Sequence, residues 1–307
     1  MLMENEMVDI QQATIDRIDL PEITGKKIRV DVLRLDKIHP VLSGNKWFKL
    51  KYYLLDALQE KKPVITFGGA FSNHILATAY TAHKLNLPST GIIRGEESAS
   101  LSHTLLMAKE LGMKLKFIPR NEYVKISNEN FTGDLELMYP GSLIIPEGGA
   151  GYPGIRGAGE IMHLVNADQY SHIACAVGSA TTFSGLAQVS TPGQTTLGIC
   201  VLKGMDDWSA GITSLLEKTG KLRHCQINND YHFGGYAKKN KELFHFMNCL
   251  YDKTRIPTDF VYTAKLFYAV FDLIRKNHFA LGSKVLIVHS GGLQGNNSLP
   301  DKTLNFN

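Results

Sequence analysis

The sequence predicts an α/β protein built on mostly parallel sheets with helices on both faces. Three observations predict this fold class: short apolar runs recur along the chain, longer amphipathic stretches lie between them, and Gly or Pro bounds several of the runs. Strands that alternate with helices in this way form parallel sheets, because each connection returns across a face of the sheet. A chain of 307 residues is long enough for two packed lobes.

The apolar runs predict seven buried strands, which are residues 64–67, 89–93, 114–118, 142–145, 172–177, 196–202 and 284–288. Helical periodicity predicts helices at residues 46–61, 72–85, 206–218 and 263–276. In the first of these helices, Leu50, Leu54 and Leu58 fall four apart on one face. Residues 221–240, which are rich in Asn and Gly, are predicted to form an irregular loop.

Composition argues against several classes of protein. The net charge of +4, from 33 basic and 29 acidic residues, is spread along the chain and gives no support to nucleic-acid binding. No apolar run approaches the ~18 residues of a membrane span, and residues 1–12 lack a signal-peptide pattern, so we expect a cytoplasmic protein. Widely spaced cysteines and the lack of a His-Glu-x-x-His motif predict neither a disulfide framework nor a metal.

The first polar motif is Ser43-Gly44-Asn45-Lys46, directly before a predicted helix. The positive end of the helix macrodipole opposes a lysine charge there and lowers the pKa of the amine. A lysine of this kind is suited to reacting with an aldehyde. Taken alone, the motif is explained better by a solvated lysine beside a Gly turn.

The second motif, Gly68 to His74, joins a predicted strand to a predicted helix. Glycines expose the first free N–H groups of the helix, which bind a phosphate or a substrate carboxylate. The alternative is that Ser72 or Asn73 is only an N-cap and that His74 is a structural hydrogen-bonding residue.

Two further loops follow predicted strands. Gly178-Ser179-Ala180-Thr181-Thr182 is small and rich in hydroxyls, which suits a phosphate. His289-Ser290-Gly291-Gly292 places the Ser290 hydroxyl where it can face a ligand ring. A tight structural turn is the alternative for each loop.

Two other patterns are weak. Gly149-Ala150-Gly151-Tyr152-Pro153-Gly154 matches a dinucleotide fingerprint, but Pro153 lies inside the turn and no acidic residue ends the following strand. Ser43-x-x-Lys46 with Lys218-Thr219-Gly220 imitates a β-lactamase-type serine hydrolase, but the chain has no Ser-Asp-Asn motif.

With its motifs in this order, the chain resembles the 1-aminocyclopropane-1-carboxylate (ACC) deaminase and D-cysteine desulfhydrase family. The resemblance runs from about residue 31 to residue 295, and the family's Gly-Asn-Lys-x-Arg-Lys-Leu appears as Gly44-Asn45-Lys46-Trp47-Phe48-Lys49-Leu50. Phe48 stands where the family has arginine. The resemblance implies a pyridoxal 5′-phosphate (PLP) enzyme with the two-domain, tryptophan-synthase-β-like fold (fold type II). Residues 1–48 plus 158–307 would form the large PLP-binding domain and residues 49–157 the smaller α/β domain.

The resemblance also assigns site residues. It implies a Schiff base between PLP and Lys46, and the other cofactor-binding residues that it implies are Lys49, Asn73, Gly178, Ser179, Ala180, Thr181, Thr182 and Ser290. The substrate-binding residues would be Ser72, Asn73, His74, Tyr236, Tyr262 and Thr263. Catalysis would use Lys46, Ser72, Tyr236 and Tyr262. A homodimer follows from the resemblance alone.

Two positions bear on the reaction. ACC deaminases carry Glu after the second tyrosine and Leu before the late Gly-Gly, whereas this chain resembles the desulfhydrases in having Thr263 and Ser290. A hydroxyl leaves the pyridine nitrogen closer to neutral than a carboxylate does, and the electron sink is weaker. We therefore expect α,β-elimination from a small amino acid, giving a 2-oxo acid and ammonia. ACC ring opening and a catalytically silent PLP-binding protein are the alternatives.

Overall fold

The computed structural model describes residues 7–126, 135, 137–204 and 224–306, and it contains two sheets. One sheet has six strands in the order β1-β2-β10-β7-β8-β9, and the other has four in the order β5-β4-β3-β6. Every pairing is parallel except that of β1 with β2. The predicted α/β class with mostly parallel sheets is therefore confirmed.

The strands are β1 Thr14–Arg17, β2 Arg29–Arg34, β3 Val64–Gly69, β4 Ser89–Arg94, β5 Lys114–Ile118, β6 Leu143–Ile145, β7 His172–Val177, β8 Thr195–Cys200, β9 Cys225–Asn228 and β10 Lys284–His289. The α-helices are α2 Pro21–Thr24, α3 Asn45–Gln59, α4 Asn73–Lys84, α5 His103–Glu110, α6 Arg120–Ile126, α8 Tyr152–Gly159, α9 Thr181–Val189, α11 Lys241–Thr254 and α12 Thr263–Arg275.

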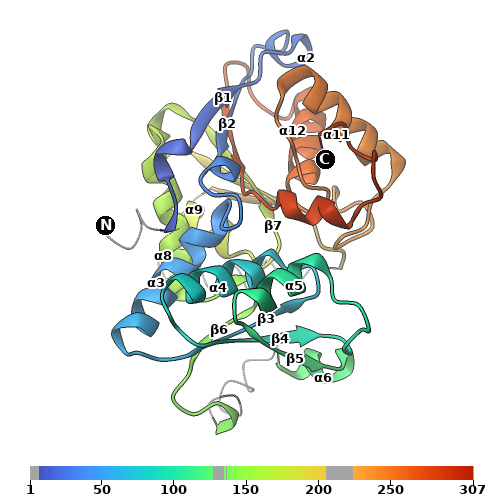
Figure 1. Cartoon of the computed structure of the whole chain (residues 1–307). Coiled ribbons are helices and arrows are strands. Elements are labelled where there is room, and N and C mark those ends of the chain that lie inside the picture. The colour runs from blue at the N-terminus through green and yellow to red at the C-terminus, as the bar shows by residue number, and fades with distance from the viewer. Residues whose placement is uncertain (1–6, 127–134, 136, 205–223, 307) are drawn as a thin grey trace.

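Helices cover both faces of the six-stranded sheet, because alternate residues of its strands enter two different cores. Leu286 of β10 packs with residues of α3 and α9. Its neighbour Ile287 packs with the apolar face of α12. The four-stranded sheet has α4 and α5 on one side and α6 on the other, and Figure 1 shows it in the lower half of the view. Helix α3 packs against strands of both sheets.

Close packing of α3 on α8 depends on glycine. A Cβ on Gly157 would lie 1.8 Å from the carbonyl oxygen of Phe48. Phe48 is itself buried in the core that α3 and α9 form with the six-stranded sheet, so an apolar side chain fills the position where the family has arginine.

All seven predicted strands are present, with ends that differ by no more than two residues. Strand β5 is a partly exposed edge strand rather than a buried one, and Leu58 is 41% exposed although it was expected on the apolar face of its helix. The prediction of an irregular loop at 221–240 was wrong in part, because β9 pairs with β8 there. The predicted helix at 206–218 and the Lys218-Thr219-Gly220 motif lie outside the described residues.

Strand β2 has no apolar run, yet it is almost wholly buried. Its charged residues are neutralised in place. Asp31, 1% exposed, pairs with Arg17 and Arg29, and Arg34 pairs with Asp16 and Asp36. Buried charges are tolerated when they are paired and hydrogen-bonded in this way.

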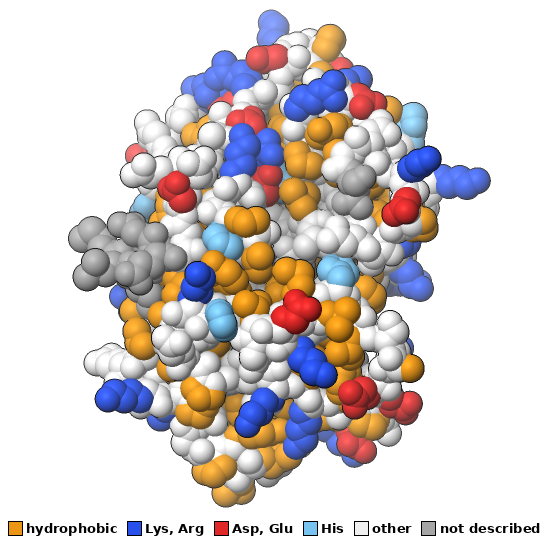
Figure 2. Space-filling view, in the orientation of Figure 1, with side chains coloured by type: hydrophobic (Ala, Val, Ile, Leu, Met, Phe, Trp, Pro, Cys, Tyr) orange, Lys and Arg blue, Asp and Glu red, His pale blue; other side chains and the backbone are white. Residues whose placement is uncertain are grey.

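On the face in Figure 2, basic and acidic side chains are interspersed. None of the helices that the structure describes is both long enough and apolar enough to cross a bilayer. The division into residues 1–48 plus 158–307 and residues 49–157 stays a prediction.

Candidate active site

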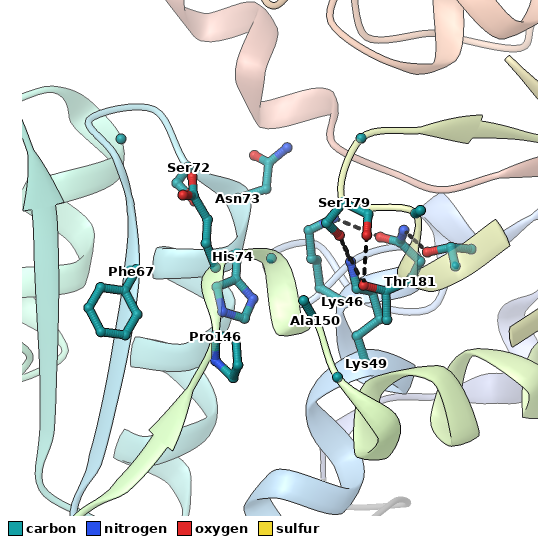
Figure 3. Close-up of a pocket in the computed structure, with 18 of the residues that line it drawn as sticks. Lys46, Lys49, Phe67, Ser72, Asn73, His74, Pro146, Ala150, Ser179 and Thr181 are labelled. Carbon is teal, nitrogen blue, oxygen red and sulfur yellow. Dashed lines mark hydrogen bonds between the residues drawn. The ribbon is translucent and has the colours of Figure 1, made fainter. Parts of the chain in front are cut away.

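A cavity of about 750 Å³ is lined by residues from both sheets. Strand carboxyl ends and the loops that follow them supply most of its wall, as in other open α/β sheets. Figure 3 shows Lys46, Lys49, Ser179 and Thr181 on one side and Ser72, Asn73 and His74 on the other. Of the site residues predicted from the sequence, all line the cavity except Thr263, and they are Lys46, Lys49, Ser72, Asn73, His74, Gly178, Ser179, Ala180, Thr181, Thr182, Tyr236, Tyr262 and Ser290.

Lys46 stands in the first turn of α3 with its amine in the cavity. Its Nζ donates to Asn45 Oδ1 over 2.7 Å, and Asn45 Nδ2 donates to Thr182 Oγ1, also over 2.7 Å. Burial lowers the pKa of the Lys46 amine to about 8, although Asp259 opposes the shift. The pKa is lowered as the sequence predicts, but burial is the main cause. Lys46 is half-buried in the cavity wall, so it is not the fully solvated lysine of the alternative.

The loop from β7 to α9 gathers hydroxyls around a second lysine. Lys49 is 4% exposed, and its Nζ donates to Ser179 Oγ over 3.1 Å. Ser179 Oγ lies 3.0 Å from Thr181 Oγ1. Helix α9 begins after Ala180, which has a left-handed φ of 55° and gives the helix no side-chain cap. The first N–H groups of α9 are therefore available to an anion.

Lys49 has no carboxylate to balance its charge within the described part of the chain. Burial, and then the nearby charge of Lys46, hold the pKa of the Lys49 amine well below its usual range. A buried ammonium and hydroxyls at an uncapped helix start together form a donor set for a phosphate.

The start of α4 forms the opposite wall. Ser72 is the N-cap, and its Oγ accepts the N–H of Ile75 over 3.3 Å. The capping interpretation of Ser72 therefore holds. Asn73 Oδ1 and His74 Nδ1 are both buried and find no hydrogen-bond partner among the residues that the structure describes. Such acceptors require donors from water or a ligand.

The tautomer of His74 is fixed by Thr66. The Thr66 hydroxyl donates to the Ile145 carbonyl over 2.9 Å, so it must accept from His74 Nε2, 2.7 Å away. Burial, followed by the charges of Lys49 and Lys46, lowers the pKa of His74 well below its usual range. His74 is thus neutral, with its proton on Nε2.

Two tyrosines close the cavity. The rings of Tyr236 and Tyr262 lie 6.2 Å apart at 71°, and Lys46 Nζ is 6.0 Å from the centre of the Tyr262 ring. A Cβ on Gly178 would lie 3.0 Å from Tyr262 Cε1, so glycine allows the ring to approach the loop. Burial is the main reason that the pKa of Tyr262 is raised well above its usual range, which keeps its hydroxyl protonated.

Thr263 is buried behind these tyrosines and is not part of the cavity wall. Its hydroxyl donates to Asp259 Oδ1 over 2.8 Å. The same carboxylate accepts the N–H groups of Val261, Tyr262 and Thr263, each over 2.9 Å. Thr263 therefore helps to fix the start of α12 rather than presenting a hydroxyl to the cavity.

Ser290 lines the cavity at the carboxyl end of β10. Its backbone carbonyl accepts the N–H of Asn45 over 3.3 Å, and a Cβ on Gly44 would lie 1.8 Å from that carbonyl oxygen. Gly44 also has a φ of 69°. These contacts bring the Gly44-Asn45-Lys46 motif against the end of β10. Ser43 does not line the cavity, which argues against the serine-hydrolase alternative.

Among the cavity residues to which the sequence assigned no site role are Arg94, Tyr123 and Glu147. Tyr123 donates to Glu147 Oε2 over 3.0 Å, and the Arg94 guanidinium lies 5.7 Å from the centre of the Tyr123 ring. Arg94 is the last residue of β4, and Glu147 follows β6. Their position at the carboxyl ends of strands was the one signal in the sequence that marked them.

No set of three or more His, Cys, Asp or Glu side chains is placed to hold a metal, as far as the described residues go. The donors instead fit a phosphorylated aldehyde. Lys49, Ser179 and Thr181 would hold the phosphate at the start of α9, and Lys46 would supply an amine of lowered pKa.

Comparison with known proteins identifies the family to which this chain belongs. The family model described as "Pyridoxal-phosphate dependent enzyme" matches residues 18–291, so this chain belongs to that family. PLP is its cofactor, and the residues described above fit it.

Individual relatives point to a smaller group of enzymes within this family. A Pyrococcus abyssi protein provisionally named 1-aminocyclopropane-1-carboxylate deaminase is 33% identical in an alignment of 300 positions that covers 90% of this chain and 88% of that protein. The bifunctional D-cysteine desulfhydrase/1-aminocyclopropane-1-carboxylate deaminase of Arabidopsis thaliana is 30% identical over 83% of this chain and 70% of its own length. The crystal structure of an ACC deaminase homologue superposes with a TM-score of 0.77 and 28% identity, covering 93% of this chain and 90% of the other. The resemblance drawn from the motifs is confirmed, and the chain is a PLP-dependent lyase.

Proposed function

We propose that this enzyme deaminates a small amino acid by α,β-elimination, with a thiolate as the preferred leaving group. The substrate class is D-cysteine or a close analogue. PLP-dependent deamination of an amino acid is the activity common to the named relatives. With D-cysteine, one water is consumed and the products are pyruvate, ammonia and hydrogen sulfide.

The Ser290 hydroxyl at the end of β10 is the observation that carries this choice of reaction. In the family, this position faces the pyridine nitrogen, and a hydroxyl does not hold a proton there as a carboxylate would. The ring is then a weaker electron sink, which is sufficient when the leaving group is good. Thiolate is a better leaving group than the ring carbon of a cyclopropane.

Bound PLP supplies an aldehyde that takes up the substrate amine and a ring that accepts electrons. The chain supplies the proton transfers. We assign Lys46 as the base that removes the Cα proton, because its amine has a pKa of about 8 and is partly neutral at physiological pH. Asn45 orients that amine through the 2.7 Å bond to its Oδ1.

The other residues bind and position. Lys49, Ser179, Thr181 and Thr182 hold the phosphate at the start of α9, and Ser72 with the first N–H groups of α4 holds the substrate carboxylate. The centre of the Tyr262 ring lies 6.0 Å from Lys46 Nζ, and the raised pKa keeps the Tyr262 hydroxyl protonated. We therefore assign Tyr262 as the acid that protonates the departing group. Tyr236 packs edge-on against the Tyr262 ring and orients it.

A substrate panel tests the proposal. The PLP-loaded protein is assayed for ammonia and 2-oxo acid with D-cysteine, L-cysteine, D-serine and ACC. We expect D-cysteine to give the highest kcat/KM, with sulfide and pyruvate in equal amounts. Turnover of ACC to 2-oxobutanoate with no sulfide from either cysteine would contradict it.

ACC ring opening is the second candidate, because most of the named relatives carry that name. A Tyr262→Phe variant separates the two chemistries. Elimination of thiolate needs little help from an acid, whereas ring opening needs a proton or nucleophile at the ring carbon. We expect the variant to lose far more activity toward ACC than toward D-cysteine. A silent PLP-binding protein would give cofactor absorbance and no product from any member of the panel.

A further inference from the structure

Lys265 is a buried charge that the proposed chemistry does not use. It lies on α12, it is 0% exposed, and it is not among the residues that line the cavity. Its Nζ donates to three backbone carbonyls: Gly235 over 2.7 Å, His232 over 2.9 Å and Val201 over 3.4 Å. An ammonium has three N–H donors, so three carbonyls account for its full capacity.

Two of the three carbonyls that Lys265 binds stand directly before cavity residues. Gly235 precedes Tyr236, and Val201 precedes Leu202, and both Tyr236 and Leu202 line the cavity. Lys265 therefore joins three segments, α12, the end of β8 and the loop after β9, at one point behind the cavity wall. Because these bonds are to the backbone, they fix the position of the main chain at Tyr236. They do not involve the Tyr236 hydroxyl.

The loop that carries Tyr236 needs such an anchor. Phe233 and Ala237, on either side of the two glycines and the tyrosine, have φ values of 51° and 53°. Non-glycine residues adopt this conformation at a cost and keep it only where surrounding contacts impose it. Tyr236 itself is 42% exposed, so side-chain packing alone holds it loosely.

We infer that Lys265 is a positioning residue for Tyr236, acting through the carbonyls of Gly235 and His232. Its counterpart is Asp259, which holds Tyr262 through backbone N–H groups at the start of the same helix. The buried cation Lys265 thus positions Tyr236, and the buried anion Asp259 positions Tyr262. The importance of Tyr236 for turnover rests on the proposed function, but the anchoring of its loop does not.

Hydrogen exchange tests the anchor without any activity measurement. Lys265→Met has a similar length and no donor, and Lys265→Gln keeps two N–H groups should the methionine variant fold poorly. We expect peptides that span residues 229–240 to exchange several-fold faster in Lys265→Met and less so in Lys265→Gln. Peptides from β7, His172–Val177, serve as the internal reference. Lys253→Met, at the exposed end of α11, is the matched control and should change neither.

A double-mutant cycle tests the link to turnover. PLP content is measured for every variant, and kcat and KM are measured with D-cysteine or whichever panel member reacts fastest. Misplacing a side chain of the active site lowers kcat by on the order of tenfold to a hundredfold, and we expect that loss in Lys265→Met. In the Tyr236→Phe background, we expect the same change to cost less than about twofold, because the group it positions is already gone.

Two outcomes would overturn the inference. One is unchanged exchange in residues 229–240 in both Lys265 variants, and the other is an equal loss of kcat in both backgrounds. If Tyr236→Phe alone is fully active, the proposed role of Tyr236 fails, and the exchange data still decide whether Lys265 anchors the loop.

Discussion

The cofactor side of the cavity and its tyrosine side are built by different means. On the cofactor side, side chains bond to one another: Asn45 to Thr182 over 2.7 Å, and Lys49 to Ser179 over 3.1 Å. On the tyrosine side, Asp259 and Lys265 bond to the backbone of the segments that carry Tyr262 and Tyr236. Changes on the cofactor side should therefore alter PLP binding directly, and changes on the tyrosine side should alter the placement of reacting groups.

The largest loss of activity is expected from changing Lys46, which belongs to both the cofactor side and the tyrosine side of the cavity. Lys46→Ala removes the amine that meets the cofactor and the base that we propose for the Cα proton. We expect kcat to fall by at least about a thousandfold, with loss of the absorbance of bound PLP. Ammonia release and the cofactor spectrum check this. Full turnover by the variant would remove Lys46 from the account.

Lys49→Met should weaken PLP binding without lowering the stability of the cofactor-free protein. Loss of a charge-assisted bond to phosphate should weaken PLP binding by on the order of tenfold to a hundredfold. Without PLP, Lys49 is a buried cation with no carboxylate among its described neighbours, so the cofactor-free variant should melt at the same or a higher temperature. PLP titration and thermal melting measure both quantities.

Lys62→Met, at an exposed site beyond α3, is the control for Lys49 and should change neither property. Unchanged PLP affinity in Lys49→Met, together with a lower melting temperature, would contradict the assignment. Lys49 would then be a structural residue and not a phosphate ligand.

The rate of PLP uptake should depend on pH through Lys46. Only the neutral amine attacks an aldehyde, and burial lowers its pKa from 10.5 to about 8. The uptake rate should therefore rise about tenfold per pH unit below pH 8 and level off above it. A free lysine derivative mixed with PLP should keep rising to about pH 10.5. Stopped-flow absorbance records both, and an uptake rate without a plateau up to pH 10 would contradict the shift.

The smallest effect is expected at Thr66, which orients His74 on the wall opposite Lys49. Thr66→Val leaves the Ile145 carbonyl and His74 Nε2 buried without their shared partner. The free energy of unfolding should fall by about 1–3 kcal/mol, or a few degrees in Tm. Thr66→Ser keeps the hydroxyl and should be close to wild type. Equal melting temperatures for the valine and serine variants would show that the bond to His74 is unimportant.

The difference between the two sides also explains what the sequence could predict. Lys46 and Lys49 lie one helical turn apart, and Ser179 to Thr182 are contiguous, so local motifs identify the cofactor side. Lys265 reaches carbonyls 30, 33 and 64 residues away, and no pattern around it in the sequence reports those contacts. Thr263 was assigned wrongly for a different reason: its hydroxyl bonds to Asp259, four residues earlier, and does not face the cavity beside Tyr262.

The fold follows the same rule. Apolar runs between Gly and Pro predicted the central strands, whereas β2 was missed because its charges are buried in pairs with residues elsewhere in the chain. Edge strand β9 was missed because it is short and only half-buried. In each case the missing information is a long-range pairing, not a local propensity.

The central claim is that the amine of Lys46, and not that of Lys49 or Lys265, meets the cofactor aldehyde. PLP-loaded protein is reduced with borohydride, digested, and mapped by mass spectrometry. The account predicts a single pyridoxyl label on Lys46 and none in Lys46→Ala. A label on Lys49, on Lys265 or on any other amine of the wild-type protein would contradict it.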